Sequence, residues 1–352
     1  MTVPSPLRLR VLEVVRETHD AVSVRFEPPV GTAELDFRPG QFLTLRVPVP
    51  EDGWAARCYS LSSTPGAGAP TITVKRVHGG QASTWICEDL RPGDEILSLP
   101  PAGTFVAGED HRDLLLFAAG SGITPVMSIL RARLARPEGS AVVIYANRDE
   151  ESVIFARELR ELAERHPGRL LVLHHLESVQ GLPTAEHLTR LCRPYADGVD
   201  LAMVCGPQPY MDACSQALTS LGLPRKKIVT ERYRSLESDP FVTSGPAATA
   251  GPAVTAEPVG QSSTAVVEID GERRELSWPA GVTLLDLLLE QGVEAPFSCR
   301  EGACSACACR VMRGEVKMLR NEVLDAQDLA EGYVLACQAL PAAERIEVSY
   351  DQ

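Results

Sequence analysis

Over the first hundred residues, short segments of alternating apolar and polar side chains are separated by proline and glycine. This spacing is typical of a small antiparallel β-barrel. Beyond Pro100-Pro101-Ala102-Gly103 the pattern changes to apolar strand-like runs that alternate with helix-like segments. The alternation predicts a doubly wound α/β domain with a parallel sheet. We expect barrel strands at 9–15, 21–26, 42–47, 71–77 and 95–99, and in the second domain strands at 114–118, 141–145, 170–175 and 201–205 with helices at 125–134 and 155–165.

The C-terminal segment has the pattern of a third module, a β-grasp. Two strand-like runs, 265–269 and 274–278, flank the dipeptide Asp270-Gly271, which is typical of a tight hairpin turn. Thr283 is placed to cap a following helix that ends at Gly292. Shorter strands are expected at 308–311, 316–318, 333–336 and 345–350.

One stretch, 238–264, has the composition of a linker. It is rich in Pro, Ala, Thr, Ser and Gly, with no apolar period. As a flexible coil, such a segment would span on the order of 30 Å. The predicted organisation is therefore a barrel at 1–105, an α/β domain at 106–237, a flexible linker at 238–264 and a β-grasp module at 265–352.

Composition narrows the function classes. The formal net charge of the 352 residues is −13, which argues against a nucleic-acid partner. From 265 to 352 there are 16 Asp and Glu against 8 Lys and Arg, a net of −8, so most of the excess lies in the third module. This acidic surface is either a docking face for a basic partner or a solvated surface without one.

Ten cysteines occur without a signal peptide before them, so we expect reduced thiols in the cytoplasm. The longest apolar run, 114–119 with its flanks, is too short for a membrane span. A soluble protein is expected.

Four of the cysteines have the C-x₄-C-x₂-C…C spacing of plant-type [2Fe–2S] ligands. Small residues between the first three allow the loop to curl around two irons. Buried structural thiols or a zinc site are the alternatives, but zinc sites usually combine two C-x₂-C pairs and only one such pair is present. A fifth thiol, Cys309, is expected to pack in the core. The predicted cluster ligands are Cys299, Cys304, Cys307 and Cys337.

Two motifs indicate a dinucleotide site in the α/β domain. Gly120-Ser121-Gly122-Ile123-Thr124-Pro125 connects a buried strand to a helix, with Thr124 expected as its N-cap. Glycines let the backbone approach a diphosphate, while the helix N-terminus offers amide donors. Cys205-Gly206-Pro207 ends a later strand, where ligands of open α/β sheets bind. Together they favour a nicotinamide nucleotide.

Two motifs in the barrel suit a flavin. Arg57-Cys58-Tyr59-Ser60 combines a cation for phosphate, an aromatic face and a hydroxyl. Val74-Lys75-Arg76 is followed by Gly80-Gln81-Ala82-Ser83-Thr84, ahead of a helix predicted at 85–90. The N-terminus of that helix would be a second anion site.

In their order along the chain, the four motifs resemble those of the ferredoxin reductase superfamily. Its flavin motif is Arg-x-Tyr-Ser, and its nicotinamide motifs are Gly-x-Gly-x-Thr-Pro and Cys-Gly-Pro. The plant-type ferredoxin module narrows the resemblance to reductases that contain FAD, nicotinamide and [2Fe–2S] domains in that order. The segments 295–302 and 333–338 resemble the reductases of 3-ketosteroid 9α-hydroxylases in particular. The texture is also similar to the reductase subunits of phenylacetyl-CoA epoxidases.

The resemblance implies a role for each matching position. Ser60, Cys205 and Tyr233 would act at the site of hydride transfer. Glu231-Arg232-Tyr233 is similar to a Glu-x-Phe element that closes over the flavin, and the hydroxyl of Tyr233 then needs a partner. FAD would be held by Arg57, Cys58, Tyr59, Ser60, Val74, Lys75, Gly80, Gln81, Ala82, Ser83 and Thr84, and the nicotinamide nucleotide by Gly120, Gly122, Thr124, Cys205, Gly206 and Pro207.

The implied function is electron transfer from NADH through FAD and a [2Fe–2S] cluster to a separate oxygenase. The favoured partner is a Rieske-type steroid 9α-hydroxylase, with a phenylacetyl-CoA epoxidase or similar di-iron oxygenase as the alternative. A different class of function is a free-standing flavin reductase whose cluster domain is regulatory or redox-sensing. The acidic run 149–151 after the second α/β strand favours NADH over NADPH. A monomer is expected.

Overall fold

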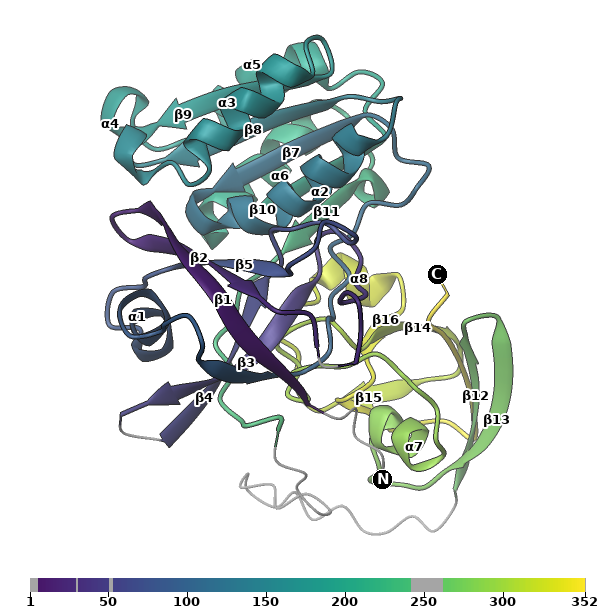
Figure 1. Cartoon of the computed structure of the whole chain (residues 1–352). Coiled ribbons are helices and arrows are strands. Elements are labelled where there is room, and N and C mark those ends of the chain that lie inside the picture. Colours follow the sequence, from purple (N-terminus) through teal and green to yellow (C-terminus); the bar gives the residue numbers. More distant parts are fainter. Residues whose placement is uncertain (1–5, 30, 51–52, 242–261, 352) are drawn as a thin grey trace. The chain divides into compact units, whose positions relative to one another are not determined.

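The computed structural model describes residues 6–29, 31–50, 53–241 and 262–351. The chain divides into two compact units. The first contains residues 7–101 and 105–233, and the second consists mainly of residues 234–352. Figure 1 traces both units from the purple N-terminal strands to the yellow C-terminal ones.

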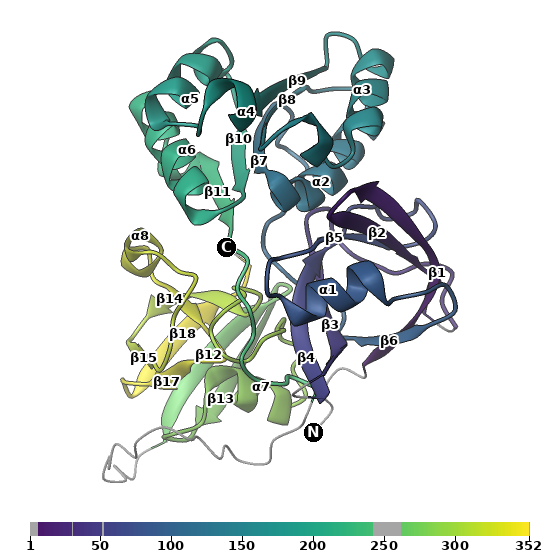
Figure 2. The same ribbon diagram turned by 90° about the vertical axis from the view of Figure 1, so that its left-hand side faces the viewer.

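The N-terminal part of the first unit is a six-stranded antiparallel sheet with the order β4-β3-β6-β1-β2-β5. An antiparallel bridge between Leu61, just after β4, and Ile72 in β5 links the two edge strands and closes the barrel. Helix α1 lies against the barrel (Figure 2). Ile86, in this helix, and Leu90, just after it, belong to the barrel core. The elements are β1 (Leu7–Thr18), β2 (Ala21–Phe26), β3 (Phe42–Val49), β4 (Gly53–Ser60), β5 (Thr71–Lys75), α1 (Gln81–Glu88) and β6 (Glu95–Ser98).

The barrel differs from the sequence prediction at two elements that carry site residues. Residues 57–60 are the end of an eight-residue strand, β4. Its sequence is only weakly apolar, so the full length of the strand was not predicted. The helix predicted at 85–90 begins at Gln81, so residues 81–84 form its first turn. The predicted start of this helix was wrong because its N-cap, Gly80, makes no side-chain hydrogen bond, so no capping residue marks the start in the sequence.

The rest of the first unit is a five-stranded parallel sheet with the order β11-β10-β7-β8-β9. Helices α2 and α3 cover one face of the sheet, and α5 and α6 cover the other (Figure 2). The doubly wound prediction is confirmed, although α5, α6 and β11 had not been predicted. The elements are β7 (Leu114–Ala119), α2 (Ile123–Ala135), β8 (Ala141–Asn147), α3 (Ala156–Arg165), β9 (Leu170–Leu176), α4 (Glu177–Gln180), α5 (Ala185–Cys192), β10 (Leu201–Cys205), α6 (Gln208–Ser220) and β11 (Ile228–Glu231).

The second unit contains a mixed five-stranded sheet with the order β13-β12-β18-β14-β16 and a small β15-β17 ribbon. As predicted, Asp270 and Gly271 form the hairpin turn, with positive φ angles of 53° and 73°. Thr283 caps α7 by accepting a hydrogen bond from the amide of Asp286. The elements are β12 (Ser263–Ile269), β13 (Glu272–Trp278), α7 (Leu284–Glu290), β14 (Ala308–Arg313), β15 (Val316–Met318), α8 (Ala326–Ala330), β16 (Tyr333–Leu335), β17 (Ala339–Pro341) and β18 (Arg345–Ser349).

Most of the predicted linker, residues 242–261, lies outside the described residues. Its first four residues, 238–241, belong to the second unit, where Pro240 is buried. In the described parts of the chain, no helix combines the length and the apolar character that a membrane crossing needs.

Candidate functional site

The two dinucleotide motifs meet at the switch point of the parallel sheet. β7 lies between β8 and β10, and the strand order reverses between β7 and β10. A Cβ atom on Gly122 would lie 2.1 Å from the carbonyl oxygen of Cys205, and one on Gly206 would lie 2.9 Å from the Cβ of Ala119. Both glycines are therefore needed for the two loops to approach each other. Crevices of this kind bind nucleotides in open α/β sheets.

The glycine loop leads into the N-terminus of α2, which has Gly122 as its N-cap and no side-chain cap. The predicted N-cap, Thr124, instead lies inside the helix and donates to the carbonyl oxygen of Ser121 at 2.9 Å. Gly120 has a φ angle of +53°, and its carbonyl oxygen accepts a hydrogen bond from the hydroxyl of Tyr145 at 3.1 Å. This bond holds the loop in place, and the amide of Ile123 bonds the carbonyl oxygens of Gly120 and Ser121. No side chain caps α2, and a helix N-terminus without such a cap suits the phosphates of a dinucleotide.

The three residues assigned to hydride transfer come together. The hydroxyls of Ser60, from the barrel, and Tyr233 lie 3.0 Å apart, and either can donate the hydrogen bond. Tyr233 also hydrogen-bonds the thiol of Cys205. The need of the Tyr233 hydroxyl for a partner is thus met by both neighbours. The ring of Tyr233 stays 41% exposed.

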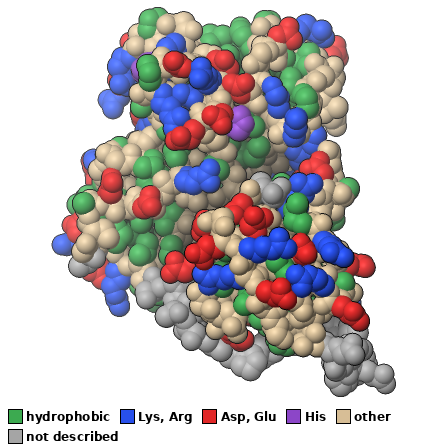
Figure 3. Space-filling view, turned by 90° about the vertical axis from the view of Figure 1, so that its right-hand side faces the viewer, with side chains coloured by type: hydrophobic (Ala, Val, Ile, Leu, Met, Phe, Trp, Pro, Cys, Tyr) green, Lys and Arg blue, Asp and Glu red, His purple; other side chains and the backbone are tan. Residues whose placement is uncertain are grey.

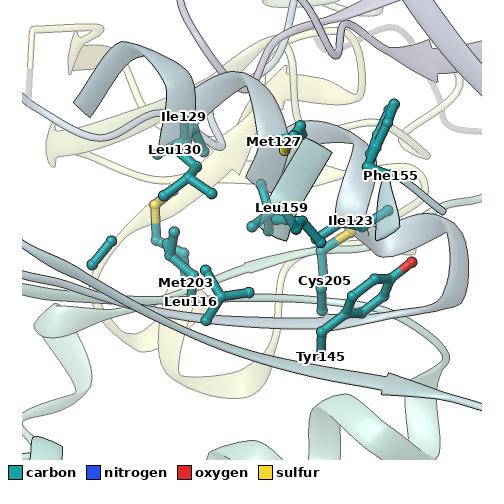
Figure 4. Packing of buried hydrophobic residues seen from close by; sticks show 14 of the residues in the cluster. Leu116, Ile123, Met127, Ile129, Leu130, Tyr145, Phe155, Leu159, Met203 and Cys205 are labelled. Carbon is teal, nitrogen blue, oxygen red and sulfur yellow. The ribbon is translucent and has the colours of Figure 1, made fainter. Parts of the chain in front are cut away.

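Cys205 lies at the end of β10 among the buried side chains between the sheet and α2, close to Ile123 (Figure 4). Its side chain is fully buried. Burial raises the pKa of the thiol well above its usual value, although the hydrogen bond with Tyr233 acts in the opposite direction. The group is therefore a neutral thiol at physiological pH rather than a reactive thiolate.

A buried carboxyl lies on the neighbouring strand. Glu231 pairs in register with Cys205 across β10 and β11, and it is 7% exposed. Burial raises its pKa to about 8. The carboxyl is therefore mostly protonated at pH 7 and can donate a proton or a hydrogen bond. The sequence had placed Glu231 in the closing element but gave no sign of this burial.

The flavin-motif residues of β4 lie at one end of the barrel opposite β3. The thiol of Cys58 lies 3.4 Å from the hydroxyl of Thr44, and the Tyr59 ring is packed partly against the barrel core. The guanidinium of Arg57 donates to the carbonyl oxygen of Ala56 at 2.7 Å. Because β4 ends at Ser60, this motif ends beside Tyr233.

The second barrel motif forms the uncapped start of α1. The hydroxyl of Ser83 accepts a hydrogen bond from the amide of Val77 and donates to the carbonyl oxygen of Gly80. The start of α1 thus has no side-chain cap, as an anion-binding helix N-terminus requires.

Lys75 belongs to a cluster of charged side chains around Asp20. Its ammonium lies 3.7 Å from the carboxylate of Asp20, and it is the group nearest to where a Cβ of Gly120 would be, at 3.9 Å. Arg148, after β8, donates to the same carboxylate at 3.0 Å. Burial alone would raise the pKa of Asp20, but a hydrogen bond from Thr18 and these cations together lower it. This cluster links the barrel to the glycine loop. Asp20 and Arg148 are 128 positions apart in the sequence, so no local pattern indicated that they would pair.

The four predicted cluster ligands are all buried in the second unit. Cys299 and Cys304 lie in one loop, where the thiol of Cys304 accepts a hydrogen bond from the amide of Cys299 at 3.4 Å. The side chain of Cys337 contacts both Cys299 and Cys307. The structure thus brings all four thiols together, from the cysteine loop and from the end of β16.

The neighbouring thiols, and then backbone amides, favour the thiolate form of Cys299. Hydrogen bonds from Cys304, from Cys337 and from the amides of Glu301 and Ala303 lower the pKa of Cys299. A thiolate is the form that binds iron. Among the described residues, no three His, Cys, Asp or Glu side chains converge on the position of one metal ion, and a two-iron cluster, with two cysteines on each iron, does not require such a group.

Cys309 lies outside this group. It is buried in the core of the second unit, and burial raises its pKa. This fits its expected role in core packing.

Three protein-family models match the chain in consecutive order. They are the oxidoreductase FAD-binding domain over residues 8–106, the oxidoreductase NAD-binding domain over 116–216, and the 2Fe-2S iron-sulfur cluster binding domain over 267–342. The expected domain order and cofactor classes are confirmed. The match to the third model includes all four predicted cysteine ligands.

Known proteins resemble the chain over its whole length. A 3-ketosteroid-9-alpha-monooxygenase ferredoxin reductase component of Mycolicibacterium smegmatis is 50% identical over 98% of this chain and 97% of its own. A component of the 1,2-phenylacetyl-CoA epoxidase of Escherichia coli is 35% identical over 97% of each chain. The crystal structure of phthalate dioxygenase reductase shares the fold, with a TM-score of 0.57 at 22% identity over 98% of each chain. The chain therefore belongs to the family of oxidoreductases, with FAD-binding, NAD-binding and [2Fe–2S] domains, that includes the ferredoxin reductase components of 3-ketosteroid-9-alpha-monooxygenases.

Proposed function

We propose that this chain delivers electrons from NADH to a separate oxygenase, a Rieske-type 3-ketosteroid 9α-hydroxylase. The observation that carries the proposal is the 50% identity to a reductase component of such a system over nearly the full length of both chains. The three sites described above supply the parts that this activity needs. We expect the reductase to be a monomer in the cytoplasm.

When bound, FAD takes a hydride from NADH and releases single electrons, and the [2Fe–2S] cluster carries one electron at a time. On this proposal, the cluster is held by Cys299, Cys304, Cys307 and Cys337. Arg57 and the first amides of α1 bind the flavin diphosphate, and Tyr59 packs along the flavin. Gly120, Gly122 and Thr124 line the phosphates of NADH.

The Ser60, Tyr233 and Cys205 side chains form a neutral hydrogen-bonded row where hydride transfer is proposed. Because either hydroxyl can donate, the row adapts to a ligand that needs a donor or an acceptor. Burial keeps the Cys205 thiol neutral, so it can face the nicotinamide without attacking the ring as a nucleophile. Glu231, on the neighbouring strand, holds a proton near this row.

The test is reconstitution with a purified Rieske-type 3-ketosteroid 9α-hydroxylase, NADH and a 3-ketosteroid. We expect NADH oxidation coupled to formation of the 9α-hydroxylated product. Cys304→Ser is the control, because it should stop delivery to the oxygenase and leave reduction of a small dye intact.

Two other results would replace the proposal. Reduction of a phenylacetyl-CoA epoxidase oxygenase but not of the steroid hydroxylase would favour the di-iron partner. Delivery by the Cys304→Ser variant at the wild-type rate would mean that the cluster is regulatory and not on the electron path.

A further inference from the structure

The cysteine loop contains a buried carboxylate that the cluster does not use. Glu301, two residues after Cys299, is 8% exposed. Its two oxygens accept three hydrogen bonds: from the amide of Glu237 at 3.0 Å, from the amide of Ser238 at 2.9 Å and from the hydroxyl of Ser238 at 2.6 Å. A buried carboxylate with this many donors is a strong, directional anchor.

The anchored segment, residues 237–238, follows the Glu231-Arg232-Tyr233 element along the chain. Tyr233 closes the row with Ser60, and only three residues, 234–236, separate it from Glu237. Four residues extend by at most about 14 Å. Within the second unit, the cysteine loop is thus hydrogen-bonded to residues 237–238, which follow Tyr233 closely in the sequence.

The backbone of Glu301 is bonded directly to one of the predicted cluster ligands. The amide of Glu301 donates to the thiol of Cys299 at 3.5 Å. Gly302 cannot accept a side chain, because a Cβ there would lie 2.9 Å from the carbonyl oxygen of Arg320, and its carbonyl accepts from the amide of Glu322 at 3.1 Å. Any movement of Glu301 is therefore passed to the ligand loop.

A second contact in the same place is weaker. The exposed carboxylate of Glu237 pairs with Arg320 at 3.0 Å, and Arg320 also pairs with Glu322. The side chain of Glu237 is 73% exposed, so solvent screens this pair. The same segment thus offers a buried anchor and an exposed one, which can be removed separately.

We propose that Glu301 is a positioning residue that latches the cysteine loop onto residues 237–238 and so sets the rate at which the cluster receives electrons. In the step concerned, reduced flavin is oxidised by one electron and the cluster is reduced by one, with no bond made or broken. The proposal rests on the electron path of the proposed function up to the cluster, but not on the identity of the oxygenase.

The primary test is Glu301→Gln in the full chain loaded with FAD and iron. An amide nitrogen then faces a backbone N–H that needs an acceptor. Hydrogen exchange followed by mass spectrometry should show the amides of residues 237–238 exchanging about tenfold faster than in the wild type, the factor that about 1.4 kcal/mol gives. The cluster should keep its visible and EPR spectra.

Anaerobic stopped-flow spectroscopy with NADH then separates the two electron steps. Reduction of the flavin by NADH should be unchanged, and reduction of the cluster should slow by roughly the same tenfold factor. Loss of a negative charge beside the cluster would by itself raise its potential and favour its reduction. A slower step therefore cannot come from the charge alone.

Three variants serve as controls. Glu294→Gln removes an exposed charge before the cysteine loop and should change neither rate. Glu237→Ala removes the exposed anchor and should have little effect. Ser238→Ala removes one donor at a distance from the cluster and should slow cluster reduction by a smaller factor, which keeps the test valid should Glu301→Gln fail to hold its cluster.

Unchanged exchange at 237–238 in Glu301→Gln, or cluster reduction at the wild-type rate despite faster exchange, would overturn the latch. So would a slowing of Glu294→Gln equal to that of Glu301→Gln, because the slower rate would then not depend on the hydrogen bonds between Glu301 and residues 237–238. Failure of the steroid hydroxylase to accept electrons would overturn the proposed function without affecting these measurements.

Discussion

Replacing Glu231 by glutamine tests the buried carboxyl at the proposed hydride-transfer site. The side chain is 7% exposed, and its pKa is raised to about 8 by burial. Glutamine has nearly the same shape and stays neutral at every pH. We expect Glu231→Gln to remove the pH-dependent part of the cost of burying this residue and to leave the strand pairing of β11 with β10 intact.

The magnitude follows from the two pKa values. The unfolded chain releases this proton near pH 4.5, whereas the folded protein holds it to about pH 8. Between these values the folded state binds more protons, so stability falls as pH rises, by about 1.4 kcal/mol per pH unit. The wild type should lose about 3 kcal/mol more than the variant between pH 5.5 and 7.5.

Urea unfolding of the FAD-loaded protein at several pH values measures this difference, with flavin fluorescence reporting on the first unit. Glu164→Gln, an exposed carboxylate on α3, is the matched control and should follow the wild type. Parallel pH curves for the wild type and Glu231→Gln would refute the reasoning, because the carboxyl would then titrate alike in both states.

Three further outcomes are expected. Cys304→Ser should lose the visible and EPR signals of the cluster but keep FAD and the reduction of a small dye by NADH, and a parallel loss of dye reduction would contradict independent modules. NADH should be preferred over NADPH in kcat/KM. Asp20→Asn should raise kcat/KM for NADPH about fivefold, the factor for about 1 kcal/mol, because Arg148 and Lys75 are released from their shared carboxylate. An unchanged ratio of kcat/KM for NADPH to that for NADH would count against this. Stopped-flow transfer to the steroid hydroxylase should slow roughly tenfold between 0.01 and 0.15 M salt, while flavin reduction changes little; a salt-independent transfer step would remove the electrostatic docking.

The last of these expectations depends on how the charges of the C-terminal module are distributed. Five of its eight basic residues form ion pairs with acidic side chains, so the net of −8 is spread over the remaining acids. On the face shown in Figure 3, acidic and basic side chains are interspersed. The surface should therefore act mainly on the encounter rate rather than as one dense acidic patch. The basic residues concerned are Arg273, Arg274, Arg300, Arg320 and Arg345.

The fold could be predicted where the pattern is local. The hairpin at Asp270-Gly271 and the Thr283 cap are set by residues adjacent in sequence, and both are confirmed. The start of α1 was missed because Gly80 caps it through its backbone alone. Thr124 looked like a cap from its type, but the close approach of Gly122 to Cys205 moves the start of the helix back. In the first case no side chain marks the start of the helix, and in the second a tertiary contact that the local sequence does not show accompanies the earlier start.

The site shows the same division. Spacing predicted which cysteines gather, and the structure brings all four together. Nothing in the sequence indicated that Glu301 would bind the segment at 237–238, or that Asp20 would hold Lys75 and Arg148. These contacts join residues that are 63 and 128 positions apart. Their charges become informative only once burial and partners are known.

The placement of charge in the first unit follows from these contacts. Where hydride transfer is proposed, burial keeps both Cys205 and Glu231 neutral, and their neighbours are hydroxyls. The cations lie instead beside the glycine loop, where Lys75 is the nearest group to Gly120. A charged group facing the nicotinamide would stabilise one redox state over the other, whereas a cation beside the phosphates stabilises binding in both. We infer that the unit separates binding from chemistry by burying its titratable groups at one end of the nucleotide and pairing its charges at the other.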